Sequence, residues 1–380
     1  HILFLSDDEK QNLHDVSVLL NDSALRAFAG CSSNSLSSEE SLYDRGKVIF
    51  YCHARFNGVH RVIEDQHYSN NLEVRIIDSS HLNVELLKRN AEILPVNFVE
   101  VEPDATVSSA FNAMVVGFDE VGRDVVRYLY EFGAFVKSGA DSDHAVRSDF
   151  HLDVIDRGMK DKAGLFIAAT PSVRCSIPFI EGMNNPDALI ELHGEDYRSV
   201  GFYMKLKEKI ETLNYIVITT DDDELNMSLG VNVFKEAVRY RENLDDLCIL
   251  VRIHNDDDGH FSKIAQYYNR LWAAQEKSDV AGRYRNNAVR SFDDCKLPLY
   301  IFGSDEDIYT YNNIIDNAEI REAARHRELY TASTESGYVM QDKEENMKWY
   351  RDVEDLLQTK DEFHPCYARM MKLRRTQCQD

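Results

Sequence analysis

Short apolar runs recur along the chain, separated by segments long enough for helices. Several runs are apolar throughout, which is typical of strands covered on both faces. Strands that alternate with helices indicate crossover connections and therefore a parallel sheet. We expect an α/β fold with helices on both faces of parallel sheets. The apolar runs are ILFL (2–5), KVIFYCH (47–53), LEVRII (72–77), AMVVGF (113–118), FHLDVI (150–155), ALIELH (188–193), YIVITT (215–220), LCILVRI (247–253) and LPLYIF (297–302).

Polar segments interrupt this alternation. Residues 30–46 are rich in serine and read as a loop, and residues 275–295 are again polar. Residues 137–149 follow a predicted helix and read as an insertion. After about residue 316 the strands end and a charge-dense, helical pattern begins. This tail has an apolar stripe, so we expect a helical cap or a dimer element; the stripe is Trp349, Val353, Leu356 and Leu357.

Three blocks of sequence recur in the same order, which indicates an internal repeat. Residues 1–20 resemble 214–234, with Asn12 on Asn226 and Asp8 on Asp222. The next blocks are 46–58 with 246–259, and 72–87 with 297–312. Residues 1–20 and 214–234 each have the pattern of a strand, an acidic turn, an asparagine and a helix. The repeat predicts tandem Rossmann-like units at 1–108 and 109–316, the first incomplete at its start, followed by a helical region at 317–380.

The second copy contains a glycine loop, VVGFDEVG (115–122). Strand, glycine turn and helix follow one another, which is the setting of a dinucleotide fingerprint. Gly117 can make the tight turn and Gly122 can let the helix approach the strand. Asp119, however, stands where the middle glycine lets backbone approach a pyrophosphate, and its charge would repel phosphate. Two interpretations of the loop remain open. It binds a nucleotide at the helix N-terminus, or it is a Rossmann turn that binds no ligand.

An acidic residue about 20 positions after such a loop usually meets a ribose hydroxyl. Asp141 has nearly this spacing but lies in a polar segment, whereas Asp156 ends an apolar strand. We prefer Asp156 as the residue that would meet the ribose. Residues 137–149 are then an insertion that lengthens the segment between the glycine loop and Asp156.

These motifs together resemble the RCK (KTN, TrkA-N) domains that regulate potassium channels and transporters. The similarity covers about 110–275 well and 1–60 in part. It rests on the glycine loop, the acid after the second strand, a Gly-Glu-Asp turn after the third, and an Asp-Asp-Glu-x-Asn turn after the fourth. A fainter similarity to a RyR-type repeat lies in the A-x-x-H-x-x-Y…W order of the tail.

The resemblance implies a Rossmann-like fold and a ligand such as NAD(H), ATP, ADP or a cyclic dinucleotide; some members bind cations instead. Family members are sensors rather than catalysts. The chain departs from the family pattern in two places, at Asp119 in the glycine loop and at the insertion before Asp156. Asp119 disfavours dinucleotide binding. The positions that the resemblance assigns to a nucleotide site are Gly117, Phe118, Asp119, Glu120, Val121, Gly122, Asp156, Arg157, Gly194, Glu195, Asp196, Thr219, Thr220 and Asp222.

The amino-acid composition indicates which classes of binding partner and which cellular setting to expect. The 380 residues carry a net charge of −23, which disfavours binding to nucleic acid. The seven cysteines are scattered without a C-x-x-C pair and indicate reduced thiols rather than a disulfide framework. No run of 18 apolar residues occurs and the first residues lack a basic signal-peptide region. We expect a cytoplasmic location, either as a free protein or as the cytosolic part of a membrane protein.

Two acidic runs follow predicted strands, at 221–224 and 255–258. Acids at a helix start favour its free N–H groups, so we expect helix caps. For 255–258 a bound Ca²⁺ or Mg²⁺ is the alternative. The histidines at 53, 60, 193, 254 and 260 show no metal-ligand spacing, so we expect no metal site.

The patterns G-x-S-x-G and H-E-x-x-H do not occur, so we expect no catalysis. The leading hypothesis is a ligand-sensing regulatory module, nucleotide-responsive and linked to potassium or other cation transport. Its expected partners are a nucleotide, a membrane channel or transporter subunit, and a second copy of the chain. The alternatives are a Rossmann scaffold that has lost its ligand and an NAD-dependent oxidoreductase.

Overall fold

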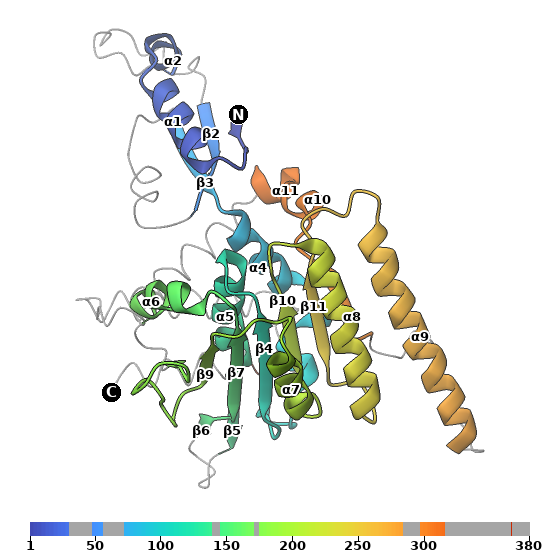
Figure 1. Ribbon diagram of the computed structural model, residues 1–380. Coiled ribbons are helices and arrows are strands. Elements are labelled where there is room, and N and C mark those ends of the chain that lie inside the picture. Colours follow the sequence, from blue (N-terminus) through green and yellow to red (C-terminus); the bar gives the residue numbers. More distant parts are fainter. Residues whose placement is uncertain are drawn as a thin grey trace. The chain divides into compact units, whose positions relative to one another are not determined.

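The computed structural model describes residues 1–29, 48–55, 72–138, 145–170, 175–283, 297–315 and Cys366 (Figure 1). The chain divides into two compact units. One comprises His1–Asn83 with Ile308–Asn317, and the other Val84–Asp307 with Ala318–Asp380. Within the described residues, every helix is too short or too polar to cross a lipid bilayer.

The second unit is built on a seven-stranded parallel sheet in the order β12-β11-β10-β4-β7-β9-β8. The order reverses between β4 and β10, and in such sheets ligands bind where the order reverses, at the carboxyl ends of the strands. The fold is therefore α/β and Rossmann-like. The strands are β4 (Phe111–Val116), β7 (Phe150–Ile155), β8 (Cys175–Ser176), β9 (Ile190–His193), β10 (Tyr215–Ile218), β11 (Cys248–Arg252) and β12 (Leu299–Phe302).

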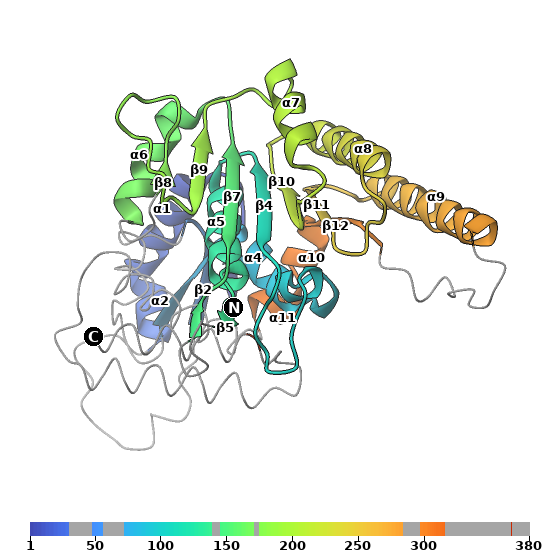
Figure 2. The ribbon, with the colours of Figure 1, turned by 90° about the horizontal axis from the view of Figure 1, so that it is seen from below.

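Helices cover both faces of this sheet (Figure 2). Alternate residues of β4 separate the two layers: Val115 packs with α5 and α6, whereas Met114 and Val116 pack with α7, α8 and α9. Because both faces are covered, β10 is apolar at every position and the neighbouring β4 and β11 are largely apolar, which is why these strands stand out in the sequence. The helices are α5 (Glu120–Gly133), α6 (Met159–Ala169), α7 (Val200–Lys209), α8 (Asp223–Tyr240) and α9 (His260–Arg283).

The first unit holds a smaller parallel sheet in the order β1-β2-β3. Helix α1 begins at Asp8, whose carboxylate accepts the N–H of Gln11, and packs Val16 and Leu20 into the core of this unit. The elements are β1 (Ile2–Phe4), α1 (Glu9–Leu20), α2 (Ser23–Phe28), β2 (Val48–His53), β3 (Leu72–Ile77) and α11 (Tyr311–Ile314). Helix α4 (Ser79–Arg89) continues from this unit into the next.

The predicted repeat corresponds to matching local structure in the two units. Strand β1 pairs with β2 as β10 pairs with β11, since Ile2 lies beside Phe50 and Ile216 beside Ile249. Both pairs are followed in order by a third parallel strand, β3 or β12.

A buried asparagine makes the same hydrogen bonds in both units. The Asn12 amide donates to Ser6 O (2.7 Å) and His53 O (3.0 Å). The Asn226 amide donates to Thr220 O (2.8 Å) and Arg252 O (3.0 Å). Each amide oxygen in turn accepts a bond from the hydroxyl of Ser6 or Thr220. The asparagine therefore ties one strand end to the next, which explains why it recurs at this position of the repeat.

Two predicted irregular segments contain regular structure. Within 137–149, β5 (Val136–Ser138) and β6 (Ala145–Arg147) form an antiparallel pair. Within 275–295, α9 continues to Arg283. Both strands of the pair are three residues long, too short for a clear alternation in sequence. The serine-rich segment 30–46 and the predicted helices of 317–380 lie outside the described residues, as does Asp141.

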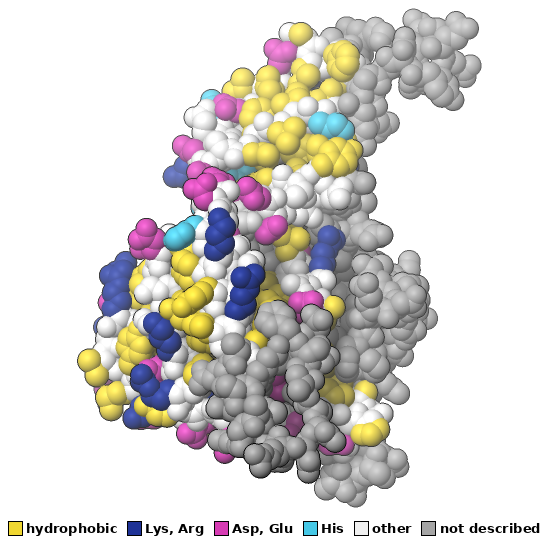
Figure 3. Space-filling model, turned by 90° about the vertical axis from the view of Figure 1, so that its right-hand side faces the viewer, with side chains coloured by type: hydrophobic (Ala, Val, Ile, Leu, Met, Phe, Trp, Pro, Cys, Tyr) yellow, Lys and Arg dark blue, Asp and Glu magenta, His cyan; other side chains and the backbone are white. Residues whose placement is uncertain are grey.

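On the face drawn in Figure 3, basic side chains lie among hydrophobic ones. The exposed side chains of helix α9 include Tyr267 and Leu271, one turn apart, and the basic Lys263 and Arg270.

Candidate functional site

The glycine loop joins β4 to α5 at the point where the strand order reverses. Gly117 has φ +98°, and a Cβ there would lie 2.8 Å from the backbone C of Thr219. A Cβ at Gly122 would lie deep inside van der Waals contact with the Gly117 carbonyl oxygen and 3.0 Å from Thr219 Oγ1. The Thr219 hydroxyl donates to that same oxygen at 3.1 Å. Both glycines are thus required by the packing of the loop against the end of β10, whether or not a ligand binds.

Asp156, the residue preferred as the ribose acid, is buried and already engaged. Its side chain is 4% exposed. One carboxylate oxygen accepts the Phe118 N–H at 2.8 Å, and the other accepts the Gly158 N–H at 2.6 Å. The Lys162 ammonium, from α6, donates to it at 2.8 Å. Asp156 therefore fixes the glycine loop from within the protein.

Lys162 joins Asp156 to Asp119. Its Nζ lies 2.6 Å from Asp119 Oδ1 as well as 2.8 Å from Asp156 Oδ2. Burial tends to lower the pKa of Lys162, but the hydrogen bonds and negative charges of the two carboxylates outweigh it, so the pKa is raised. A raised pKa keeps the ammonium charged up to alkaline pH. Below, Asp119, Lys162 and Asp156 together are called the lysine clamp.

A third carboxylate approaches the lysine clamp from the end of β10. Burial raises the pKa of Asp221, and the charge of Asp119 and a hydrogen bond to Asp119 raise it further. Arg252, at the end of β11, has a lowered pKa chiefly because of burial, opposed by Asp221, Asp223, Asp119 and Asp305. Its Nε atom is buried without a hydrogen-bond partner. The carboxyl edge of the sheet is therefore rich in carboxylates, and Lys162 and Arg252 are partly buried cations among them.

Replacing Asp221 by Asn is expected to raise the melting temperature at pH 7, because it removes a carboxylate that Asp119 repels. The rise should be only about 1–2 °C, because Asp221 is exposed and solvent screens its charge. A carboxyl whose pKa is raised on folding binds its proton more tightly in the folded state. Its ionisation therefore removes stability as pH rises from about 4 through the raised pKa. Melting curves from pH 3 to 8 should converge for the two proteins at the acid end. A variant less stable than the native chain at pH 7 would contradict this view of Asp221.

The other residues expected in the site follow the same edge. Thr220 binds Asn226, and Asp222 caps α8 by accepting the Leu225 N–H at 2.9 Å, as expected for the acidic run 221–224. Asp223 instead accepts the N–H groups of His254 and Asn255, both at 2.9 Å. In the second acidic run, Asp256 accepts the N–H groups of Phe261 and Ser262 at the start of α9, which is a helix cap.

The Gly-Glu-Asp turn follows β9. Gly194 packs on the ring of Phe179, since a Cβ there would lie 3.3 Å away. Glu195 accepts the hydroxyl of Ser199 at 3.0 Å, and Ser199 caps α7. Asp196 accepts the Arg198 N–H at 2.8 Å, and the exposed Arg157 follows Asp156 at the end of β7. Each of these groups has a structural partner or is exposed, and the parallel strands bring them to the same sheet edge as Gly117.

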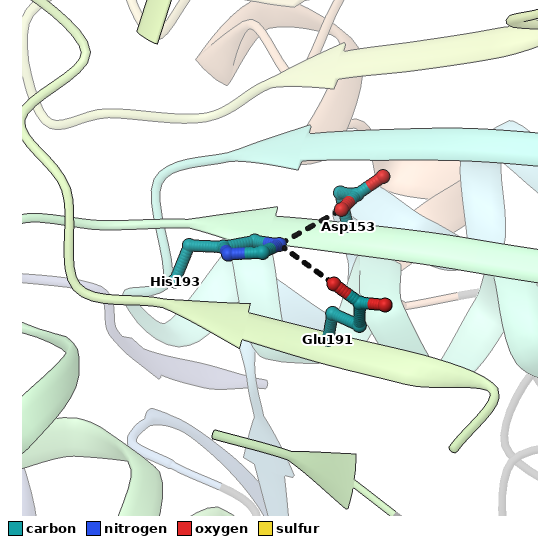
Figure 4. Close-up of side chains that lie close together, drawn as sticks. All are labelled: Asp153, Glu191 and His193. Carbon is teal, nitrogen blue, oxygen red and sulfur yellow. Dashed lines mark hydrogen bonds and ion pairs between the residues drawn. The ribbon is translucent and has the colours of Figure 1, made fainter. Parts of the chain in front are cut away.

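A separate polar cluster lies on the sheet face formed by β7 and β9 (Figure 4). His193 Nε2 is 2.8 Å from Asp153 Oδ1 and 3.5 Å from Glu191 Oε2. The Lys205 ammonium lies 3.2 Å from His193 Nδ1, and Lys209 contacts Asp153 Oδ2. Because an ammonium can only donate, Nδ1 is the acceptor and the ring proton is on Nε2. Burial tends to raise the pKa of Asp153, but the bonds from His193 and Lys209 outweigh it and lower the pKa.

The sequence patterns do not assign Lys162, Arg252 or the β7–β9 cluster to a functional site. Lys162 lies six positions after Asp156, which places it one turn into α6 and facing back to the strand end. This spacing would have been a usable signal. The cluster depends on strand register, which single-sequence patterns do not contain.

No protein-family model matches the chain, and no curated protein matches it significantly.

Proposed function

We propose that the chain is a non-catalytic regulatory module of the RCK kind, linked to cation transport, whose nucleotide crevice is closed by the lysine clamp. One observation carries the second part of this proposal: the Lys162 ammonium bridges Asp119 and Asp156 at 2.6 and 2.8 Å. The regulatory role, the membrane channel or transporter as partner and pairing with a second copy rest on the sequence resemblance. The cytoplasmic setting rests on the composition of the chain as well.

Charge supports a closed crevice. A helix N-terminus attracts anions, and Asp119 supplies one at the start of α5. A phosphate entering here would meet the Asp119 and Asp221 carboxylates, and both would repel it. Asp156, which would hold a ribose hydroxyl, already accepts two backbone N–H groups and Lys162. Binding of a dinucleotide would have to break these contacts.

Nucleotide sensing is the second candidate, favoured by Arg252. Its guanidinium lies at the carboxyl end of β11, and its Nε has no hydrogen-bond partner. Arginine binds phosphate through several N–H groups, so an anion could use this side chain. In that case the nucleotide would have to displace Lys162, and binding would open the clamp.

An oxidoreductase activity has less support. Tyr203 and Lys207 have the Tyr-x-x-x-Lys spacing that short-chain reductases use, but both lie on α7 and face α8. Asn232 donates to the Tyr203 hydroxyl at 3.3 Å, and Lys207 lies over the Tyr240 ring. Both groups are engaged in helix packing.

A thermal-shift panel tests this proposal on the native chain with NAD, NADH, ADP, ATP and cyclic dinucleotides. A nucleotide bound with a Kd of about 10 μM and present at about 1 mM would add roughly 2.7 kcal/mol of stability. The melting temperature would then rise by about 5–10 °C. We expect no such rise with any of the nucleotides. A rise with one of them that is lost in Arg252→Met would favour nucleotide sensing, and turnover of a hydride acceptor would favour the oxidoreductase.

A further inference from the structure

The β7–β9 cluster contains two carboxylates that the sheet sets directly opposite each other. Asp153 and Glu191 are Cα partners in the parallel pair of β7 and β9. Like charges in this arrangement destabilise a sheet unless a positive group lies between them. Asp153 is 3% exposed, so bulk water cannot screen it. The position between the two carboxylates, into which His193 Nε2 points, is therefore suited to a cation.

A cavity lies beside the cluster. It has a volume of about 230 Å³ and is lined by Asp153, Glu191, Lys209, His151 and Asn112, among others. Such a volume holds several water molecules, since one water occupies about 30 Å³ in the liquid. Water from this cavity could complete the coordination of an ion bound to the three side chains.

We propose that Asp153, Glu191 and His193 bind a divalent transition-metal ion, preferentially Zn²⁺. Imidazole nitrogen together with carboxylate oxygens is a donor set that suits zinc, and bonds of about 2.1 Å separate neighbouring ligand atoms by roughly 3.0–3.4 Å. The Nε2 atom is 2.8 Å from Asp153 Oδ1 and 3.5 Å from Glu191 Oε2, and all three ligand atoms lie within 4.8 Å of one another. Small side-chain rotations bring them to one ion.

The two lysines have different roles in this site. Lys209 contacts Asp153 Oδ2, the oxygen that does not face His193, and can keep orienting the carboxylate. A metal ion takes the lone pair of Nε2, so the ring proton moves to Nδ1. The Lys205 ammonium, 3.2 Å from Nδ1, must then withdraw. Lys205 therefore competes with the metal, and its removal strengthens binding.

Titration of the full chain with Zn²⁺ and Co²⁺ tests this site, using calorimetry and the visible absorption of bound Co²⁺. We expect one ion per chain, with a cobalt spectrum free of thiolate charge-transfer bands. Both His193→Gln and the exposed Glu191→Gln should weaken binding at least ~10-fold, since the loss of a residue that only supports a ligand already costs about 10–100-fold. The matched control Glu211→Gln, an exposed carboxylate outside the cluster, should leave the affinity unchanged. Lys205→Met should raise it several-fold.

Two results would overturn the metal site. One is that the native chain binds no metal at about 1 mM. Its dissociation constant would then be higher than those of metal sites in proteins. The other is equal binding by the native chain, His193→Gln and Glu191→Gln. Either would leave the cluster as an internal ion network that links β7, β9 and α7. Glu191→Gln keeps the test valid if His193→Gln fails to fold, because the Glu191 side chain is 49% exposed. The result does not depend on nucleotide binding at the glycine loop.

Discussion

Replacing Gly122 by Ala is expected to lower the free energy of unfolding by about 3 kcal/mol, which is the upper range for overpacking a tight site. The added methyl group would overlap the carbonyl oxygen of Gly117 and crowd the Thr219 hydroxyl. Neither neighbour can yield easily, because Gly117 is backbone at φ +98° and itself packs against Thr219. Urea denaturation of the native chain and the variant measures the difference.

The matched control is Gly164→Ala, also within a helix of the second unit. A Cβ at Gly164 would meet nothing within 4 Å. Alanine in an open helical position is more favourable than glycine by roughly 0.5–1 kcal/mol, so this variant should gain stability. Equal effects of the two substitutions would show that the contact between the loop and β10 is not as close as described.

Replacing Lys162 by Met is expected to lower the free energy of unfolding by about 2–3 kcal/mol, somewhat below the range for breaking a fully buried ion pair. The substitution keeps most of the side-chain length and removes the charge. Asp156 would then be a carboxylate with a 4% exposed side chain and no adjacent ammonium, although the N–H groups of Phe118 and Gly158 would remain. Denaturant unfolding at pH 7 provides the measurement.

Lys160→Met is the control for the loss of a positive charge on α6. Lys160 is exposed, whereas the Lys162 side chain is 24% exposed and contacts both carboxylates. Surface charges contribute about 0–1 kcal/mol, so the control should change stability little. If Lys162→Met were no more destabilising than Lys160→Met, the lysine clamp would have no structural role.

Much of the fold could be predicted because its determinants are local in sequence. The strands of the second sheet are covered on both faces, and this leaves uninterrupted apolar runs such as 215–218. The repeat was visible because Asn12 and Asn226 each join two strand ends through the same hydrogen bonds. The glycine loop was visible because close packing excludes a side chain at both Gly117 and Gly122.

The missed features depend on contacts between distant segments. Lys162 gains its role only when α6 folds back over the glycine loop, and Arg252 only when β11 lies beside β10. Asp153, Glu191 and His193 meet because β7 and β9 pair in one register, and a shift by one residue would turn these side chains to the other face. Glu191 and His193, two residues apart on β9, share one face of that strand, but the sequence does not show that Asp153 on β7 joins them.

The central claim is that the lysine clamp closes the crevice in which related folds bind a nucleotide. Calorimetric titration of ADP and NADH into the native chain and into Asp119→Gly tests it most directly. The claim predicts no measurable heat of binding for the native chain up to about 1 mM ligand. A Kd above about 1 mM corresponds to a binding free energy weaker than about 4.1 kcal/mol. Removing the carboxylate should allow binding in Asp119→Gly. Micromolar binding of either nucleotide by the native chain would contradict the claim.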